Sequence, residues 1–154
     1  MTRHTGALAA AVVTAAIALT GCAAKADQPA DPTATAGPQA PAIVIPYDEL
    51  LNQKTVTRAI TLHVGDTLQV SLGSNPSTGF QWAPQMQISD GKVLVQSGHE
   101  PIGPTDSRPG APGSEVWALQ ALAPGTTTAS TTYSRPWEGG EKDTWTFTAT
   151  VTVN

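Results

Sequence analysis

Three observations in the sequence predict an all-β domain built as an immunoglobulin-like β-sandwich. Between residues 144 and 153, apolar side chains alternate with five threonines, which is the pattern of a strand with one buried face. Shorter apolar runs with the same period recur upstream, between turns rich in Gly and Pro. The signals of an amphipathic helix are missing from residues 43–154. About seven or eight short strands spaced in this way indicate two packed sheets, here without the cysteine pair of antibody domains.

Each predicted strand is placed by its own alternation. Residues 60–64 and 68–72 alternate on either side of a turn at Gly65-Asp66, and the strand at 126–133 follows the turn residues Pro124-Gly125. A slip of one residue in the last strand would bury its threonines instead of its apolar side chains. The residues expected to face the core are Ile60, Leu62, Val64, Leu68, Val70, Leu72, Phe80, Trp82, Val93, Val95, Trp117, Leu119, Ala121, Ala129, Thr131, Trp145, Phe147, Ala149, Val151 and Val153.

The amino terminus has the form of an export signal. Arg3 and His4 precede a mostly apolar run from Gly6 to Leu19. This run is short for a membrane span and has the flanks of a secretory signal peptide. We therefore exclude it from the folded domain.

Cys22 is the only cysteine of the chain, so it has no internal disulfide partner and another role is expected. The sequence Leu19-Thr20-Gly21-Cys22 resembles the lipoprotein box of bacteria, in which residues 1–21 are removed and the cysteine receives lipid such as palmitate. Each buried CH₂ of an acyl chain adds about 0.8 kcal/mol of membrane affinity. We expect an exported protein, lipid-anchored to the outer face of the bacterial cell membrane. The alternative is a soluble secreted protein with an incidental cysteine.

A linker separates the predicted anchor from the folded part. Residues 22–42 are mainly Ala, Pro, Thr, Asp and Gln, with too few large apolar side chains to offset the entropy of ordering. Their prolines favour extended geometry and give the domain reach from the membrane. Residues 43–154 form one domain of ordinary size, which we expect to be a monomer. The formal net charge is −4 and the basic residues are scattered, which argues against nucleic acid as a partner.

The domain offers little for catalysis. His63 lies on the polar phase of a predicted strand, so we expect it at the surface. His99 stands beside Glu100, but no third ligand or nucleophile has the spacing of a metal site or a catalytic triad. Phosphate loops and dinucleotide fingerprints are also missing. We therefore predict that the protein is not an enzyme and has no catalytic residues, metal site or cofactor.

A turn with the sequence N-P-S-T-G-F presents polar side chains on a stiff backbone. Asn75 can bond to its own backbone, Pro76 fixes one φ angle, and Gly79 permits a left-handed conformation. The turn would therefore project Ser77 and Thr78 on a rigid frame. An ordinary hairpin turn with the same residues is the alternative.

Two further segments have interface features. The connection from Gly98 to Gly113 is long, and a structureless connection of this length in a compact domain is usually functional or disordered. Trp137 falls outside the periodic core pattern and follows Arg135-Pro136, and tryptophan with arginine is typical of an interface hot spot. The alternative is a tryptophan that folds back over the edge of the core.

Taken in order, these motifs resemble the chagasin-type inhibitors of papain-like cysteine peptidases, and the resemblance covers nearly the whole folded domain. The elements that carry it are an N-P-[ST]-T-G-[YF] turn, a Gly-rich loop at residues 108–113, the spacing of Trp117, Ala121 and Gly125, and a Tyr-x-Arg-Pro-Trp motif that ends at Trp137.

The resemblance implies that three loops gather at one end of the sandwich and block the active-site cleft of a papain-like cysteine peptidase as a reversible competitive wedge. Ser77 and Thr78 would approach the catalytic cysteine and histidine of the peptidase without presenting a cleavable bond. Trp137 would pack on an aromatic surface, held by Arg135 and Pro136. The peptidase-binding residues implied are Asn75, Pro76, Ser77, Thr78, Gly79, Phe80, Gly110, Ala111, Pro112, Gly113, Arg135, Pro136 and Trp137.

Three positions depart from the family pattern. Ser77 and Phe80 stand where Thr and Tyr are usual, and Pro112 stands where a second glycine is common, so the resemblance leaves the course of the middle loop open. The alternative function is a membrane-anchored surface recognition module that binds cell-wall glycan or a partner protein with the same loop end. A purely structural envelope protein is a third option, favoured only if Trp137 is buried.

Overall fold

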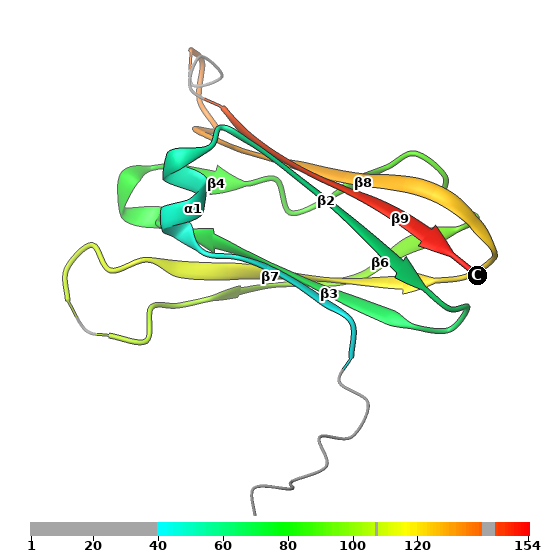
Figure 1. Ribbon diagram of the computed structural model, residues 1–154. Helices are drawn as coiled ribbons and strands as arrows, with labels where there is room; N and C mark the ends of the chain where they lie inside the picture. Colours follow the sequence, from blue (N-terminus) through cyan, green and yellow to red (C-terminus); the bar gives the residue numbers. More distant parts are fainter. Residues whose placement is uncertain (1–39, 107, 140–143) are drawn as a thin grey trace, which may run out of the picture. The chain divides into compact units, whose positions relative to one another are not determined.

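The computed structural model describes residues 40–106, 108–139 and 144–154 (Figure 1). In these ranges the chain forms a two-layer β-sandwich with one short helix, α1 (Tyr47–Asn52), which confirms the predicted all-β fold. None of the helices described there is long and apolar enough to cross a membrane. The strands are β1 (Ala42–Ile45), β2 (Thr55–Leu62), β3 (Thr67–Ser74), β4 (Gln81–Trp82), β5 (Gln87–Ile88), β6 (Leu94–Ile102), β7 (Gly113–Ala121), β8 (Gly125–Ser134) and β9 (Trp145–Val153).

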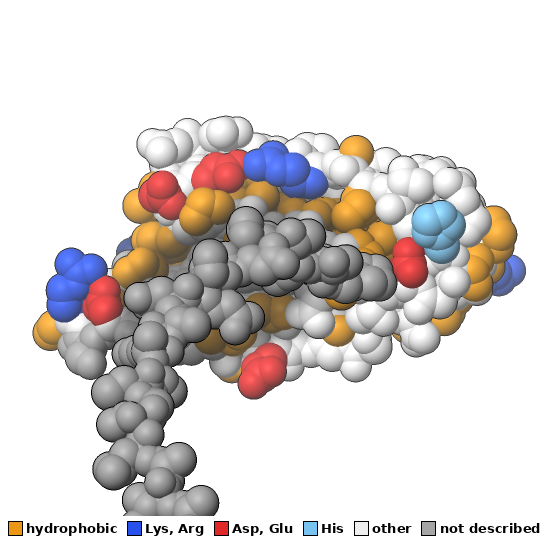
Figure 2. Space-filling view, turned by 60° about the horizontal axis from the view of Figure 1, so that its bottom comes forward, with side chains coloured by type: hydrophobic (Ala, Val, Ile, Leu, Met, Phe, Trp, Pro, Cys, Tyr) orange, Lys and Arg blue, Asp and Glu red, His pale blue; other side chains and the backbone are white. Residues whose placement is uncertain are grey.

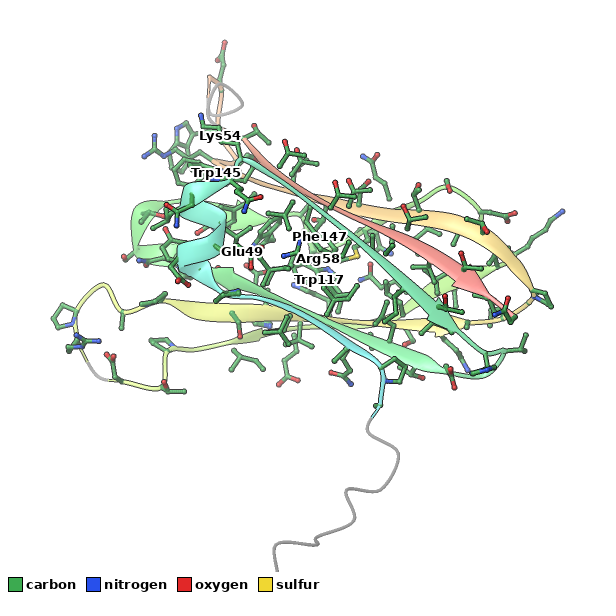
Figure 3. The ribbon with its side chains drawn as sticks, viewed as in Figure 1. Glu49, Lys54, Arg58, Trp117, Trp145 and Phe147 are labelled. Atoms are coloured by element: carbon green, nitrogen blue, oxygen red, sulfur yellow. The ribbon has the colours of Figure 1, made fainter. Side chains whose placement is uncertain are left out.

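The strands form two sheets with different neighbours along the chain. One sheet has the order β1-β3-β7-β6, and the other has the order β2-β9-β8-β4, with β5 also paired to β8. Most pairs are antiparallel, but β1 runs parallel to β3 and β2 runs parallel to β9. Trp117 and Phe147 lie between the sheets (Figure 3), and both are fully buried.

The predicted alternation of the last strand is confirmed. In β9, Phe147 and the three apolar residues after it at every second position are buried, and the threonines between them are half-buried. Along β7 and β8 the predicted inward residues are buried as well, including Thr131. An alternation with a period of two therefore predicts correctly which face of each central strand is buried.

Two predicted core residues lie at the surface instead. Val64 is 50% exposed because β2 ends at Leu62 and the chain then turns, with the Asp66 amide donating to the carbonyl of His63. Val95 is 38% exposed because Leu94 is the inward residue of β6. The prediction was wrong at both positions. The apolar alternation that predicts Val64 continues past the end of β2, and the alternation that predicts Val95 assigns the wrong face of β6 to the core.

The connection predicted from Gly98 to Gly113 is shorter than expected. Residues 98–102 continue β6, after a bulge between Gln96 and Gly98, and pair with β7. These residues lie on an edge strand with little burial, so no apolar alternation marks them in the sequence. Gly113 is the first residue of β7, and a Cβ there would lie 2.4 Å from the carbonyl oxygen of Ile102. The loop proper consists of residues 103–112.

The segment before β2 contains a helix and a strand that the alternation pattern does not predict. β1 begins at Ala42, one residue before the predicted start of the domain, and α1 has only six residues, which is too short for a clear helical period. Leu50 is buried in the core, and Glu49 pairs with Arg58 of β2 (Figure 3). At the start of the helix, the backbone of Tyr47 packs directly against Gly73 of β3.

We predict that Gly73→Ala destabilises the domain. A Cβ at this position would lie 2.3 Å from the backbone nitrogen of Tyr47, which cannot move without shifting α1. Overpacking of this kind costs about 1–3 kcal/mol of unfolding free energy. Urea unfolding measures it, and Gly91→Ala is the matched control, because a Cβ there meets nothing within 4 Å. Equal unfolding free energies for the two variants would contradict the close packing of α1 on β3.

Candidate binding site at the loop end

Three loops lie at one end of the sandwich, on the left in Figure 1. The first loop (residues 75–80) joins β3 to β4, the second loop (residues 103–112) joins β6 to β7, and the third loop (residues 135–139) follows β8. The carboxyl-terminal residue Asn154 lies at the opposite end. The topology therefore brings together the three segments that the sequence singled out.

Asn75 organises the first loop from inside. Its backbone amide donates to the hydroxyl of Tyr133 at 2.8 Å, and its side-chain Oδ1 accepts from the hydroxyl of Ser77 at 2.7 Å. The hydroxyl of Thr78 donates to the Asn75 carbonyl at 2.7 Å. Residues 76–78 form a 3₁₀ turn that ends at Gly79, which has a φ of 81°. Asn75 is buried and holds the loop from within, while Pro76, Ser77 and Thr78 are exposed.

A side-chain hydrogen bond joins the first loop to the second. Nδ2 of Asn75 donates to the carbonyl of Gly110 at 2.9 Å, so a single buried amide serves both loops. The second loop is closed by the Ala111 amide, which donates to the carbonyl of Arg108 at 3.0 Å. Arg108 also pairs with Asp106 at 2.7 Å, and this guanidinium lowers the pKa of the exposed Asp106 carboxyl.

The third loop meets the first through a tryptophan and a glycine. A Cβ on Gly79 would lie 2.6 Å from Cη2 of Trp137, so only a glycine admits the indole at this distance. The guanidinium carbon of Arg135 stands 4.5 Å from the ring centroid of Phe80 and 5.7 Å from that of Trp137. Such cation–π contacts orient both rings. Trp137 is 53% exposed, so it is not folded over the core.

An aromatic cluster supports the three loops from below. The ring of Tyr133 lies 5.4 Å from that of Phe80, 5.0 Å from that of Trp82 and 6.1 Å from that of Trp145, measured between centroids. Tyr133 itself is buried. Packed aromatic rings of this kind resist displacement, since each contact adds to the area that they bury.

Tyr47 of α1 is a further residue at this site, and the alternation pattern did not indicate it. Its ring packs edge-on against the ring of Tyr133, with 6.5 Å between the centroids. Burial and the neighbouring Tyr133 raise the pKa of Tyr47, and the Thr78 hydroxyl opposes this. Ile43 and Ile45 just before it are buried, but an alternation of only two apolar residues is too short to predict a strand.

The predicted site residues divide into exposed and supporting groups. Asn75 and Phe80 are buried beneath the loops, and Gly113 belongs to β7. Gly79, Ala111 and Arg135 are half-buried. The exposed residues, which form the outer surface of the loop end, are Pro76, Ser77, Thr78, Gly110, Pro112, Pro136 and Trp137.

His63 and His99, the histidines in the described ranges, have different surroundings. The His63 side chain is 82% exposed. Nε2 of His99 lies 2.9 Å from Glu115, whose other carboxylate oxygen accepts from the hydroxyl of Ser74 at 3.1 Å. The carboxylate thus stands between the serine and the histidine, so the imidazole is not placed to activate the hydroxyl as in a catalytic triad. Across the described part of the chain, no three His, Cys, Asp or Glu side chains gather as metal ligands do.

The family assignment follows from comparison with known proteins. The model of the chagasin family of peptidase inhibitors, family I42, matches residues 61–151. The chain belongs to the chagasin family. It is 31% identical to chagasin of Trypanosoma cruzi over 99 residues, which are 62% of this chain and 88% of chagasin. It is 33% identical to amoebiasin-2 of Entamoeba histolytica over 98 residues, 60% of this chain and 76% of that protein.

Solved structures similar to this chagasin-family chain have the same fold. A crystal structure of a cysteine protease inhibitor from Entamoeba histolytica aligns with a TM-score of 0.58 at 24% identity, over 77% of this chain and 100% of that one. The structure of PbICP-C in complex with falcipain-2 aligns with a TM-score of 0.55 at 20% identity, over 74% of this chain and 99% of that one. The predicted family and fold are therefore confirmed.

We predict that Gly79→Ala displaces Trp137, whereas Gly139→Ala does not. Both glycines have a φ of 81°, so an alanine introduces the same backbone strain at each. Only at Gly79 does the new methyl group meet the indole, since nothing lies within 4 Å of a Cβ at Gly139. The chemical shifts of the Trp137 ring protons should change in the first variant alone. Equal changes in both variants would contradict the packing of the first loop on the third.

Proposed function

We propose that this protein is a reversible competitive inhibitor of papain-like cysteine peptidases and that its loop end enters the active-site cleft. The observation that carries the proposal is the joining of all three loops into one rigid ridge by Asn75 and Trp137 in a chagasin-family chain. A solved neighbour in complex with falcipain-2 supports a peptidase as the partner. The family's members are named as inhibitors, so the protein is not an enzyme.

The geometry of the first loop explains why the inhibitor would not be cleaved. Papain-like peptidases must hold a substrate in extended form for attack on its carbonyl carbon, as in a near-attack arrangement. Here the Thr78 amide donates to the carbonyl of Asn75 at 3.1 Å, and the Gly79 amide donates to that of Pro76 at 3.0 Å. These bonds hold the loop tip in a 3₁₀ turn. Ser77 and Thr78 would thus fill the cleft with no peptide bond in substrate geometry.

Stiffness is the energetic basis of the proposed inhibition. Loops that are already held by internal hydrogen bonds lose little conformational entropy when they bind, so more of the contact energy remains as affinity. Inhibitor–peptidase interfaces of about 1,600 Å² can be among the tightest known for this reason. In this chain Pro76 and Pro112 add to the effect, because a proline fixes its own φ angle.

The alternative of a glycan-binding or general recognition module has less support. The half-exposed Trp137 would suit sugar stacking, but the family description and the solved neighbours refer to peptidase inhibition. A purely structural envelope role was expected only for a buried Trp137, and the indole is exposed. Competition between the inhibitor and an active-site-directed peptidase ligand distinguishes the cleft wedge from both alternatives.

We predict that Trp137→Ala weakens inhibition of papain and of a cathepsin L-like peptidase by at least about tenfold, equal to about 1.4 kcal/mol of binding free energy. Trp137 is the large exposed aromatic residue of the loop end, and its truncation removes contact area without opening the core. The inhibition constant of residues 40–154 measures the effect. Leu122→Ala, at an exposed residue away from the three loops, is the control. An unchanged inhibition constant would remove Trp137 from the interface.

We also propose that the protein is exported and lipid-anchored through Cys22, which lies outside the described residues. The support is the sequence around this single cysteine and the Pro-rich linker that follows it. In a bacterial host, the full chain should appear in the membrane fraction and the Cys22→Ser variant in the soluble exported fraction. Thr20→Ser, which keeps the cysteine, is the control. A Cys22→Ser protein that stays with the membrane after a high-salt wash would refute the anchor.

A further inference from the structure

An ordered segment outside the family match lies beside the binding loops. The family model matches residues 61–151, but β1 and α1 precede that range and pack on the sandwich. Within this segment, the ring of Tyr47 packs edge-on against Tyr133 at 6.5 Å, and the Tyr47 backbone lies against Gly73 of β3. The segment is therefore held rigidly at the loop end, where it adds surface that the matched region does not supply.

A hollow of about 450 Å³ lies between this segment and the end of the second loop. Two aliphatic side chains on its rim are largely exposed, Val44 at 65% and Leu51 at 58%. Figure 2 shows hydrophobic side chains at the loop end of the face that comes forward from the bottom of Figure 1, and others toward its opposite end. The residues that give the hollow its apolar character are Val44, Ile45, Pro46, Tyr47, Leu51 and Pro112.

The hollow is continuous with the loops proposed to enter the peptidase. Pro112 belongs both to the second loop and to the wall of the hollow, and Tyr47 lines the hollow while its ring packs on Tyr133 beneath the loops. Leu51 lines the same hollow as Pro112, so it lies next to the loop that is proposed to enter the cleft. An isolated aliphatic side chain needs no explanation, but two beside a binding loop gain free energy when a partner covers them.

The charges around the hollow indicate what the partner presents there. Asp48 lines the hollow and is exposed, whereas Glu49 beside it is paired with Arg58. Asp48 is thus the carboxylate that faces the opening. The surface suits an apolar side chain with a basic group next to it.

We propose that this hollow is a fourth contact area for the inhibited peptidase and takes an apolar side chain from the rim of its active-site cleft. The inference rests on the proposed function and adds to it a contact that lies outside the matched family region. Leu51 is its main anchor, because it is large, exposed and carried on a helix that is fixed to the domain by buried Leu50 and by the packing of the Tyr47 backbone on Gly73.

Leu51→Glu tests the contact area. A carboxylate in the hollow should weaken inhibition of papain or a cathepsin L-like peptidase by about tenfold, mainly through faster dissociation. Val64→Glu is the matched control, because Val64 is 50% exposed in the turn after β2, at the end of the sandwich opposite the loops (Figure 1). Both residues are exposed, so their substitution should leave the thermal midpoint almost unchanged. Equal inhibition by Leu51→Glu and Val64→Glu would overturn the contact area.

A second measurement on the unmutated protein keeps the test independent of any variant's folding. In the complex with papain, amide hydrogen exchange of residues 47–53 should slow together with that of residues 75–80. Slowing of the loops alone would overturn the fourth contact and leave the proposed function standing. A protein that inhibits neither peptidase would overturn both proposals. Self-association that Leu51→Glu abolishes without loss of inhibition would assign the hollow to a second copy of the chain and overturn the peptidase contact.

Discussion

The hydrogen bond from the Asn75 amide to the Tyr133 hydroxyl is the interaction on which the loop end depends. It crosses the sandwich, because Asn75 follows β3 of one sheet and Tyr133 lies in β8 of the other. Both residues are buried, so without the hydroxyl the amide would be left unsatisfied at a cost of roughly 1–3 kcal/mol. Because the Asn75 side chain also holds Gly110, the same anchor positions two loops at once.

Two glycines make this arrangement possible, because a neighbouring segment packs directly against the backbone of each. Gly79 admits the indole of Trp137 and also supplies the left-handed turn that ends the 3₁₀ segment. Gly73 admits the start of α1, which brings the ring of Tyr47 against Tyr133 beneath the loops. The rigidity of the loop end thus comes from backbone contacts that any larger residue would prevent, in addition to hydrogen bonds.

The sequence predicted the fold wherever a strand had one buried face. Alternation in β9 gave the correct inward residues, since the period of two is a direct consequence of the pleat. It failed at Val95, on an edge strand with little burial, and for α1, which is too short to show a period. The three loops could be singled out by their turn residues, but the bond from Asn75 to Gly110 joins positions 35 residues apart and has no local signal. The role of Tyr47 is hidden for the same reason.

The three residues that depart from the family pattern lie in different surroundings, so their effects on the loop surface differ. Phe80 is buried and its ring contacts both Tyr133 and the guanidinium of Arg135, so this residue supports the loop end and adds little to its outer surface. Ser77 is exposed, but its hydroxyl is bonded to Asn75, so the change from threonine removes only a methyl group from the contact surface. Pro112 affects two regions, because it stiffens the second loop and also lines the hollow together with Leu51. Phe80 therefore lies beneath the loop surface, Ser77 lacks only a methyl group there, and Pro112 faces the surface that the amino-terminal segment adds.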